Sequence, residues 1–182
     1  MTPAAPPIAA SARLRYEPLA PAHAAELAGW LGDPRLWRWI PHAAPTPSEV
    51  ARRFAVISQS ARPNGDRWLN FVARRNADGQ AVGLVETTVY PDGRAHLAYF
   101  VFLPFQRHGY AREACAGVLA HLRDDCGVTQ VEALVDTRNE PSQRLLATLH
   151  FTRDDAVVPA DPIDGAPAFD YRYRLTLGSR AA

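Results

Sequence analysis

Apolar residues near the N-terminus recur first at strand spacing and then at helical spacing. A short strand is expected at residues 14–18. In PAHAAELAGWLG, residues 21–32, one helical face is apolar and Gly32 provides a stop; the residues of that face are Ala24, Leu27, Ala28 and Leu31. The stretch TPSEV reads as a capping box, so a second helix is predicted from Thr46 to about residue 58.

The middle of the chain changes to the period of strands. Strands are predicted at residues 68–75, 81–90 and 95–103, separated by the turn sequences NADGQ and PDGR. Short connections of this kind join antiparallel neighbours, so the three strands are expected to form a meander. This part of the fold is therefore predicted to be an antiparallel sheet.

Helical spacing returns after the turn at residues 106–111. The next helix is predicted to end at Gly127, and a strand at 131–137 should lie parallel to its predecessor because a helix joins the two. A further helix should start at Pro141, residues 165–168 should be loop, and FDYRYRLTL at 169–177 should be the last strand. The predicted order is β-α-α-β-β-β-α-β-α-β, with no internal repeat.

Composition indicates one soluble globular domain. The 182 residues are 47 % hydrophobic and 21 % charged, and no apolar run approaches a membrane span of about 20 residues. The domain is predicted at 13–177, with a disordered Pro/Ala-rich arm at 1–12 and a tail at 178–182. The arm lacks the features of a signal peptide. The two cysteines have no disulfide or metal spacing, which favours a cytoplasmic protein without a metal site.

The charge balance excludes several functions. The net charge of +1 gives no basic surface for nucleic acid. All 20 residues counted as Lys or Arg are arginine. A Walker-type phosphate loop and a Schiff-base mechanism both need a lysine, so the sequence excludes both.

The segment FQRHGYAREA, residues 105–114, places a polar turn between an apolar strand and an apolar-striped helix. Gly109 allows close backbone approach, and the helix N-terminus attracts anions. Arg107, His108 and Arg112 add donors and positive charge, so the segment suits a pyrophosphate. The alternative is an ordinary strand-to-helix turn. The dinucleotide motif G-x-G-x-x-G is absent.

Several motifs together resemble one family. QRHGYA matches the Q/R-x-x-G-x-G/A signature of the GNAT superfamily of acetyl-CoA-dependent N-acetyltransferases. AYFVFLPFQRHGYAREA resembles its strand, pyrophosphate loop and helix start, and VEALVDTRNEPSQRLLATLHF resembles the following strand and helix. LRYEPLAPAHAAELAGWLGDPRLWRWIP looks like the opening of the Rim-type branch, which acetylates ribosomal-protein N-termini. The resemblance covers roughly residues 13–177.

The resemblance implies an α/β (α+β) fold with a mixed, mostly antiparallel sheet of six to seven strands, flanked by helices. Its fourth and fifth strands would splay apart and hold acetyl-CoA in the gap. Backbone groups near Phe100 and Val101 would bind the thioester, and Asn139 would touch the pantetheine arm. The full set of residues implied to bind the cofactor is Phe100, Val101, Phe102, Gln106, Arg107, His108, Gly109, Tyr110, Ala111, Arg112 and Asn139.

The resemblance also suggests catalytic residues. Many members carry a tyrosine acid on the last helix, but Leu146 occupies that position here. The Rim-type branch has N-x-x-S instead, so Ser142 would hydrogen-bond the CoA sulfur; the alternative is a small residue in a first helical turn. Glu86 is the first candidate for the base that deprotonates the amine, unless it faces solvent. His96 and His42 are weaker candidates.

The acceptor is the least specified part. Trp37 and Trp39 are expected to form a wall of the acceptor site, joined by Tyr99, although packing on the core is the alternative. The predicted reaction is transfer of acetyl to a primary amine, of a protein N-terminus or a small molecule, by direct attack in a ternary complex. The alternative is a non-catalytic acyl-CoA-binding module. Relatives often dimerise, and an exposed strand edge would offer a route to a homodimer.

Overall fold

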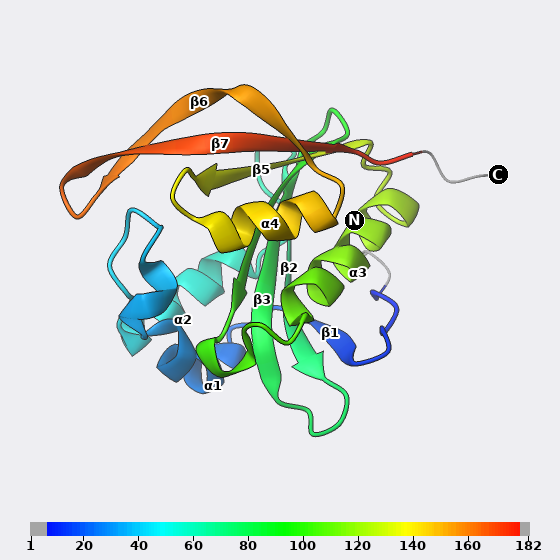
Figure 1. Ribbon diagram of the computed structural model, residues 1–182. Helices are drawn as coiled ribbons and strands as arrows, with labels where there is room; N and C mark the ends of the chain where they lie inside the picture. Colours follow the sequence, from blue (N-terminus) through cyan, green and yellow to red (C-terminus); the bar gives the residue numbers. More distant parts are fainter. Residues whose placement is uncertain (1–6, 179–182) are drawn as a thin grey trace.

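A computed structural model describes residues 7–178, which form one seven-stranded sheet with helices on both faces (Figure 1). The strands are β1 (Leu14–Pro18), β2 (Arg67–Arg75), β3 (Ala81–Val89), β4 (Arg94–Val101), β5 (Gln130–Asp136), β6 (Thr152–Ile163) and β7 (Ala166–Thr176). The helices are α1 (His23–Leu31), α2 (Pro47–Ile57), α3 (Tyr110–Asp124) and α4 (Glu140–Thr148), with short 3-10 helices η1 (Pro34–Trp37) and η2 (Leu103–Phe105).

The sheet is mixed, with the order β1-β2-β3-β4-β5-β7-β6. All neighbours are antiparallel except β4 and β5, which α3 connects and which run parallel. These two strands pair only from Arg94 opposite Gln130 to His96 opposite Glu132. Beyond these pairs they separate, which confirms the predicted mixed sheet with splayed central strands.

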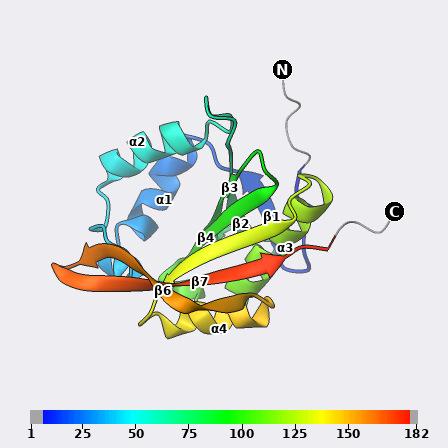
Figure 2. The same ribbon diagram turned by 90° about the horizontal axis from the view of Figure 1, so that it is seen from above.

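The two faces of the sheet carry different helices. Helices α1 and α2 lie on one face, and α3 and α4 lie on the other (Figure 2). Because side chains alternate along a strand, neighbouring residues of β4 point to opposite faces. Tyr99 reaches Ser142 on α4, whereas the Phe100 ring lies 5.2 Å from the ring of Trp37, measured between centroids. The end of β4 therefore presents side chains to both faces.

The core forms between the sheet and these helices. The apolar face predicted for the first helix is buried, and so is that of α3; the buried residues are Ala24, Leu27, Ala28 and Leu31 of α1, and Ala114, Cys115, Val118, Leu119 and Leu122 of α3. The capping box of α2 is also present, with Thr46 and Glu49 bonding each other reciprocally. Local patterns thus specify these helices correctly.

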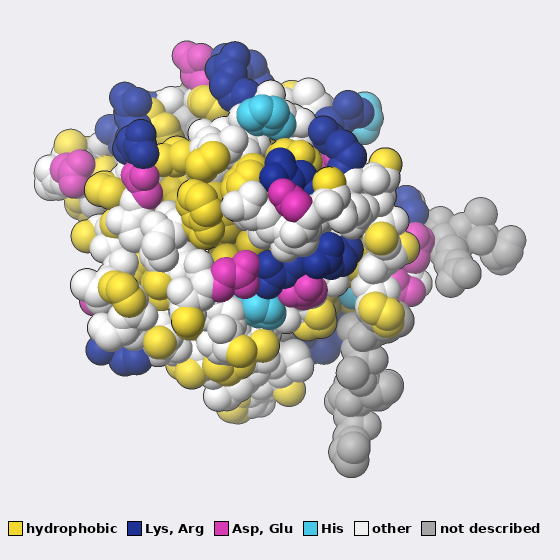
Figure 3. Space-filling model, turned by 90° about the horizontal axis from the view of Figure 1, so that it is seen from below, with side chains coloured by type: hydrophobic (Ala, Val, Ile, Leu, Met, Phe, Trp, Pro, Cys, Tyr) yellow, Lys and Arg dark blue, Asp and Glu magenta, His cyan; other side chains and the backbone are white. Residues whose placement is uncertain are grey.

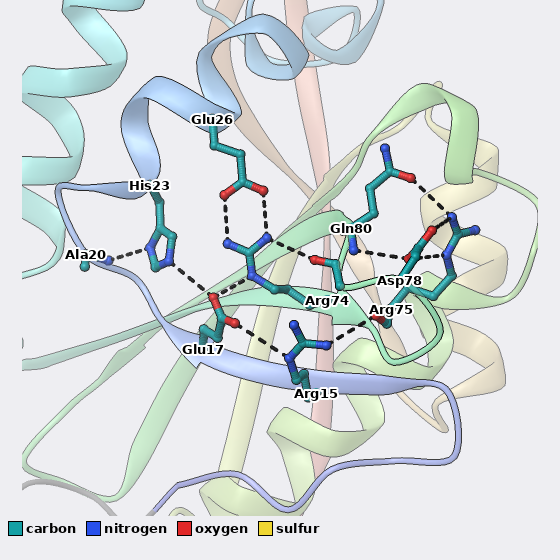
Figure 4. A network of polar contacts seen from close by, with 10 residues as sticks. Arg15, Glu17, Ala20, His23, Glu26, Arg74, Arg75, Asp78 and Gln80 are labelled. Carbon is teal, nitrogen blue, oxygen red and sulfur yellow. Dashed lines mark hydrogen bonds and ion pairs between the residues drawn. The ribbon is translucent and has the colours of Figure 1, made fainter.

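A buried arginine joins the N-terminal elements to the sheet (Figure 4). Arg74 of β2 is 9 % exposed, and its guanidinium donates to Glu26 of α1 at 2.7 and 2.8 Å and to Glu17 of β1 at 2.5 Å. The Arg74 hydrogen bonds hold the pKa of Glu26 below its usual range. Because a buried guanidinium needs partners, this network fixes α1 against β1 and β2.

Two boundary predictions are wrong. Residues 152–163 form strand β6, and β7 begins at Ala166 in the stretch predicted to be loop. The proline- and aspartate-containing sequence of β6 has no strand pattern, but such residues are tolerated because β6 is an edge strand paired only with β7.

At the N-terminal end, residues 7–12 of the predicted disordered arm are packed: Ile8 is buried and Ser11 bonds Glu113. Residues 1–6 lie outside the described residues.

Candidate active site

The turn between β4 and α3 presents a row of free backbone donors. Arg107 and Gly109 both have left-handed backbones, with φ of +63° and +81°. Within residues 7–178, the backbone N–H groups of residues 107–112 donate to no protein acceptor. Consecutive free N–H groups at a helix N-terminus form an anion site, and left-handed residues curve such a loop around its ligand. The structure thus provides a suitable cradle for a pyrophosphate.

Positive side chains accompany these amides. Arg107 and Arg112 are exposed, and neither forms an ion pair with any described residue. Seen from the lower end of Figure 1, arginine and hydrophobic side chains lie next to one another in the middle of the surface (Figure 3). Two other predicted ligands shape the loop instead: Gln106 Nε2 donates to the Val101 carbonyl at 3.0 Å, and His108 Nδ1 lies 2.7 Å from the Gln106 carbonyl.

Arg13 holds this loop from β1's side, although 95 residues separate it from His108 in the chain. Its Nη1 donates to the His108 carbonyl at 2.9 Å, and its Nε donates to Glu113 of α3 at 2.7 Å. The guanidinium also lies 4.8 Å from the centre of the Tyr110 ring. Burial acts against the charge of Glu113, but hydrogen bonds from Ser11 and Arg13 keep its pKa below the usual range. No local sequence pattern indicates these contacts between Arg13 and the loop.

Replacing Arg13 with alanine is expected to raise the KM for acyl donor about tenfold while leaving kcat nearly unchanged. The loop would lose charge-assisted hydrogen bonds worth roughly 1.5–3 kcal/mol, but the reacting groups lie elsewhere. Steady-state kinetics with varied donor would measure the effect. Arg15→Ala is the control, because Arg15 lies only two residues further along the chain, in β1, and its side chain bonds Arg75 and Glu17 instead of the loop. An unchanged KM, or an equal fall in kcat, would contradict this role.

The gap between β4 and β5 lies beside this loop. A small pocket lined by Gly83, Tyr99, Val101 and Ala111, among others, lies between the β3–β4 pair and α3. Phe100 and Val101 pair with β3 but have no partner on β5, so one edge of β4 stays open here. The side chain of Phe102, another residue predicted to bind the cofactor, is fully buried against Trp30, and its N–H donates to the Val82 carbonyl.

Ser142 and Tyr99 meet at the side of the gap that faces α4. Their hydroxyl oxygens lie 2.5 Å apart, and the Asn139 side chain accepts from the Ser142 N–H at 3.3 Å. Asn139 thereby caps α4. Burial raises the pKa of Tyr99, so its phenol stays protonated and can donate through Ser142. Tyr99 was expected to lie with Trp37 and Trp39 at the acceptor site. It lies instead on the opposite face of the sheet.

Trp37 and Trp39 lie on the other face of the sheet, which carries α1 and α2. Trp37 donates from Nε1 to the Leu31 carbonyl at 2.7 Å and covers Phe100. The Trp39 ring lies 4.6 Å from the guanidinium carbon of Arg38 and 5.3 Å from that of Arg138. Both indoles are half-buried. The loop after α1 therefore covers the end of β4 on the face of α1 and α2.

The predicted base, Glu86, also lies on this face, since its β3 position pairs with Ala98 of β4. Both of its carboxylate oxygens accept from Arg53 of α2, at 2.7 and 2.5 Å. An amine proton would have to displace that guanidinium, which argues against Glu86 as the base. His96 lies where β4 and β5 are still paired, and burial lowers its pKa.

The described residues offer neither a metal site nor a plausible nucleophile. No three His, Cys, Asp or Glu side chains among residues 7–178 are placed to hold a metal ion. Cys115 is fully buried on α3, and burial raises the pKa of its thiol. No helix in this range is long and apolar enough to cross a membrane.

A splayed parallel strand pair beside a cradle for a pyrophosphate defines an acyl-CoA-dependent transferase. Comparisons agree with this class. The family model described as acetyltransferase (GNAT) domain matches residues 13–152. The chain belongs to this family, whose members use acetyl-CoA, and it is an acetyl-CoA-dependent N-acetyltransferase.

Solved structures share the fold. A GNAT-family acetyltransferase from Bacillus anthracis has a TM-score of 0.80 at 16 % identity, with 93 % of this chain and 97 % of that chain covered. An enzyme from Salmonella typhimurium that modifies the N-terminal serine of a 50S ribosomal subunit protein has a TM-score of 0.80 at 15 % sequence identity. The match covers 94 % of this chain and 99 % of that chain. Spermidine N-acetyltransferase from Vibrio cholerae, solved with CoA and spermine, has a TM-score of 0.78 at 15 % sequence identity. The match covers 91 % of this chain and 96 % of that chain. No curated protein matched in sequence.

Proposed function

We propose that this enzyme acetylates an acceptor that carries one primary amine, namely a protein N-terminus. The amine would attack acetyl-CoA directly in a ternary complex. The observation that carries the proposal is the open edge of β4, which has Ser142 and Tyr99 on one side and Trp37 and Phe100 on the other. Donor and acceptor can therefore approach the gap from opposite faces of the sheet. The catalytic contribution is positioning, together with stabilisation of the thioester oxygen by free backbone N–H groups.

The residues present fit acetyl-CoA. The free amides of residues 107–112, with Arg107 and Arg112, suit its pyrophosphate, and Tyr99, which is hydrogen-bonded to Ser142, lines a small pocket together with Ala111 of the same turn. The bound donor supplies the activated acetyl group. Ser142, hydrogen-bonded to a protonated Tyr99, is placed to deliver a proton to the departing sulfur.

The charges of the acceptor face favour a single amine over a polyamine. Glu86 is paired with Arg53, Asp136 with Arg138, and Glu132 with Arg174. A polycationic acceptor needs several unpaired carboxylates, and arginines already neutralise these three, which leaves Asp170 of β7 as the fourth carboxylate of this face. Among structural relatives, the Salmonella enzyme acts on an N-terminal serine and the Vibrio enzyme on spermidine. The arginine–carboxylate pairs of this chain support an N-terminal amine as the acceptor.

The test is thiol release from acetyl-CoA in the presence of a panel of acceptors: tetrapeptides starting with serine, alanine or methionine, spermidine, tyramine and free amino acids. We expect release that depends on the amine, fastest with a tetrapeptide, and an acetylated product by mass spectrometry. Faster turnover of spermidine would overturn the choice of acceptor. Donor binding without thiol release from any amine would identify an acyl-CoA-binding module instead.

A further inference from the structure

The reaction needs a group that removes a proton from the attacking amine, and the paired Glu86 does not fit that role. The face of the sheet that carries α1 and α2 holds four carboxylates near the β4–β5 gap. Strand alternation and register place Glu86, Glu132, Asp136 and Asp170 there. The first three are held by arginines, as described above. Asp170 differs from them.

Asp170 lies on β7 directly opposite Asp136, the last residue of β5. The Thr137 N–H donates to the Phe169 carbonyl at 2.9 Å, which fixes β7 against the end of β5 at this point. Asp170 is half-buried, and its side chain forms no hydrogen bond or ion pair with any residue in the range 7–178. It is therefore a free carboxylate beside the splayed end of β5.

The surroundings of Asp170 suit a proton acceptor. Burial raises its pKa, and the charge of Asp136 raises it further. The Arg138 guanidinium is bound to both oxygens of Asp136 and forms no hydrogen bond or ion pair with Asp170. On β7 the next side chain of this face is Arg172, which lies 4.0 Å from Glu132, and β6 presents the uncharged Val158. A general base works best when its pKa lies close to the working pH. An aspartate whose pKa is raised is therefore a better base than one with an ordinary pKa.

The geometry also separates the two proton transfers. Asp170 lies on the α1–α2 face with Trp39, whose ring contacts Arg138, whereas Ser142 and Tyr99 lie on the α3–α4 face. Trp39 contacts Arg138, and Arg138 binds Asp136, which lies opposite Asp170. The proton acceptor and proton donor thus stand on opposite sides of the gap.

We propose that Asp170 is the general base that takes the proton from the acceptor amine. This inference rests on the proposed function. In the step, the amine nitrogen bonds to the thioester carbonyl carbon, the carbon–sulfur bond breaks, and the electron pair leaves with sulfur. One nitrogen proton passes to the Asp170 carboxylate and then to water, and the thiolate takes a proton from Ser142, which regains one from solvent. The products are the amide and free CoA thiol.

The test compares Asp170→Asn and Asp170→Glu with Asp155→Asn, using the fastest acceptor of the panel across pH. Asp155 is an exposed aspartate on the neighbouring strand β6 and has no described partner, so it is a matched control. We expect Asp170→Asn to lower kcat about 100-fold with an unchanged KM for acetyl-CoA. The wild-type rate should rise with pH as Asp170 deprotonates, and that limb should vanish in Asp170→Asn. Asp170→Glu should recover part of kcat.

Three results would overturn the inference. They are a kcat of Asp170→Asn within twofold of wild type, an unchanged pH profile, or a fall in kcat that accompanies an equal loss of acetyl-CoA binding in all Asp170 variants. The last result would indicate a structural role. If wild type binds acetyl-CoA but acetylates no acceptor, the proposed function fails first, and the inference falls with it. Active wild type with an equally active Asp170→Asn rejects only the inference.

Discussion

Replacing Ser142 with alanine is expected to lower kcat about 100-fold, near the lower end of the range for general-acid catalysis, because a thiol is a good leaving group. The hydroxyl of Ser142 lies 2.5 Å from that of Tyr99, so the pair can pass a proton to the departing sulfur. Alanine removes the atom that links Tyr99 to the gap. The KM for acetyl-CoA should change little, since the loop proposed to bind the pyrophosphate is untouched.

Tyr99→Phe and the double variant test whether the two hydroxyls act together. Residues that act as one unit give non-additive losses, so the double variant should be about as slow as Ser142→Ala alone. Thr148→Ala on the same helix is the control, because its exposed hydroxyl bonds only the Leu145 carbonyl. Single-turnover rates would measure the chemical step. Fully additive losses, or full activity in Ser142→Ala, would show that water supplies the proton.

Replacing Gly83 with alanine is expected to lower the free energy of unfolding by about 2–3 kcal/mol, a typical cost of overpacking a tight interior. A Cβ at Gly83 would overlap the carbonyl oxygen of Phe100 and lie 3.1 Å from the Val101 Cα. Both obstacles are backbone, so β3 and β4 must move apart. The displaced segment includes Phe100 and Val101, which are proposed to bind the thioester, so acetyl-CoA binding should weaken together with stability.

Gly29→Ala on α1 provides the matched control. No atom lies within 4 Å of the position that its Cβ would take, and alanine favours a helix over glycine by roughly 0.5–1 kcal/mol. Urea denaturation should therefore show stabilisation for Gly29→Ala and destabilisation for Gly83→Ala. Equal stability of wild type and Gly83→Ala would mean that β3 and β4 are less tightly packed here than the structure indicates.

The sequence predicted the parts of the fold that depend on local patterns. The capping box at Thr46, the apolar faces of α1 and α3, and the glycine-containing turn before α3 all follow from residues close together in the chain. The splayed strands followed only from the family resemblance. Strand β6 was missed because an edge strand needs no alternating apolar pattern when its only partner is β7.

The candidate site was less predictable because its contacts join distant segments. Arg13 with His108, Arg53 with Glu86, and Tyr99 with Ser142 are separated by 95, 33 and 43 residues. A single sequence shows that Glu86 is a carboxylate in a strand, but not that an arginine from α2 covers it. Asp170 drew no attention for the same reason, since only the β5–β7 register brings it opposite Asp136.

The turn before α3 is proposed to bind the pyrophosphate of acetyl-CoA. The most direct measurement is calorimetric titration of the purified protein with acetyl-CoA, with NAD as a control that also carries a pyrophosphate. We expect saturable binding of acetyl-CoA at one site and no binding of NAD. Absence of binding at millimolar acetyl-CoA would contradict it, because the free amides and arginines of the turn would then serve no ligand of this kind.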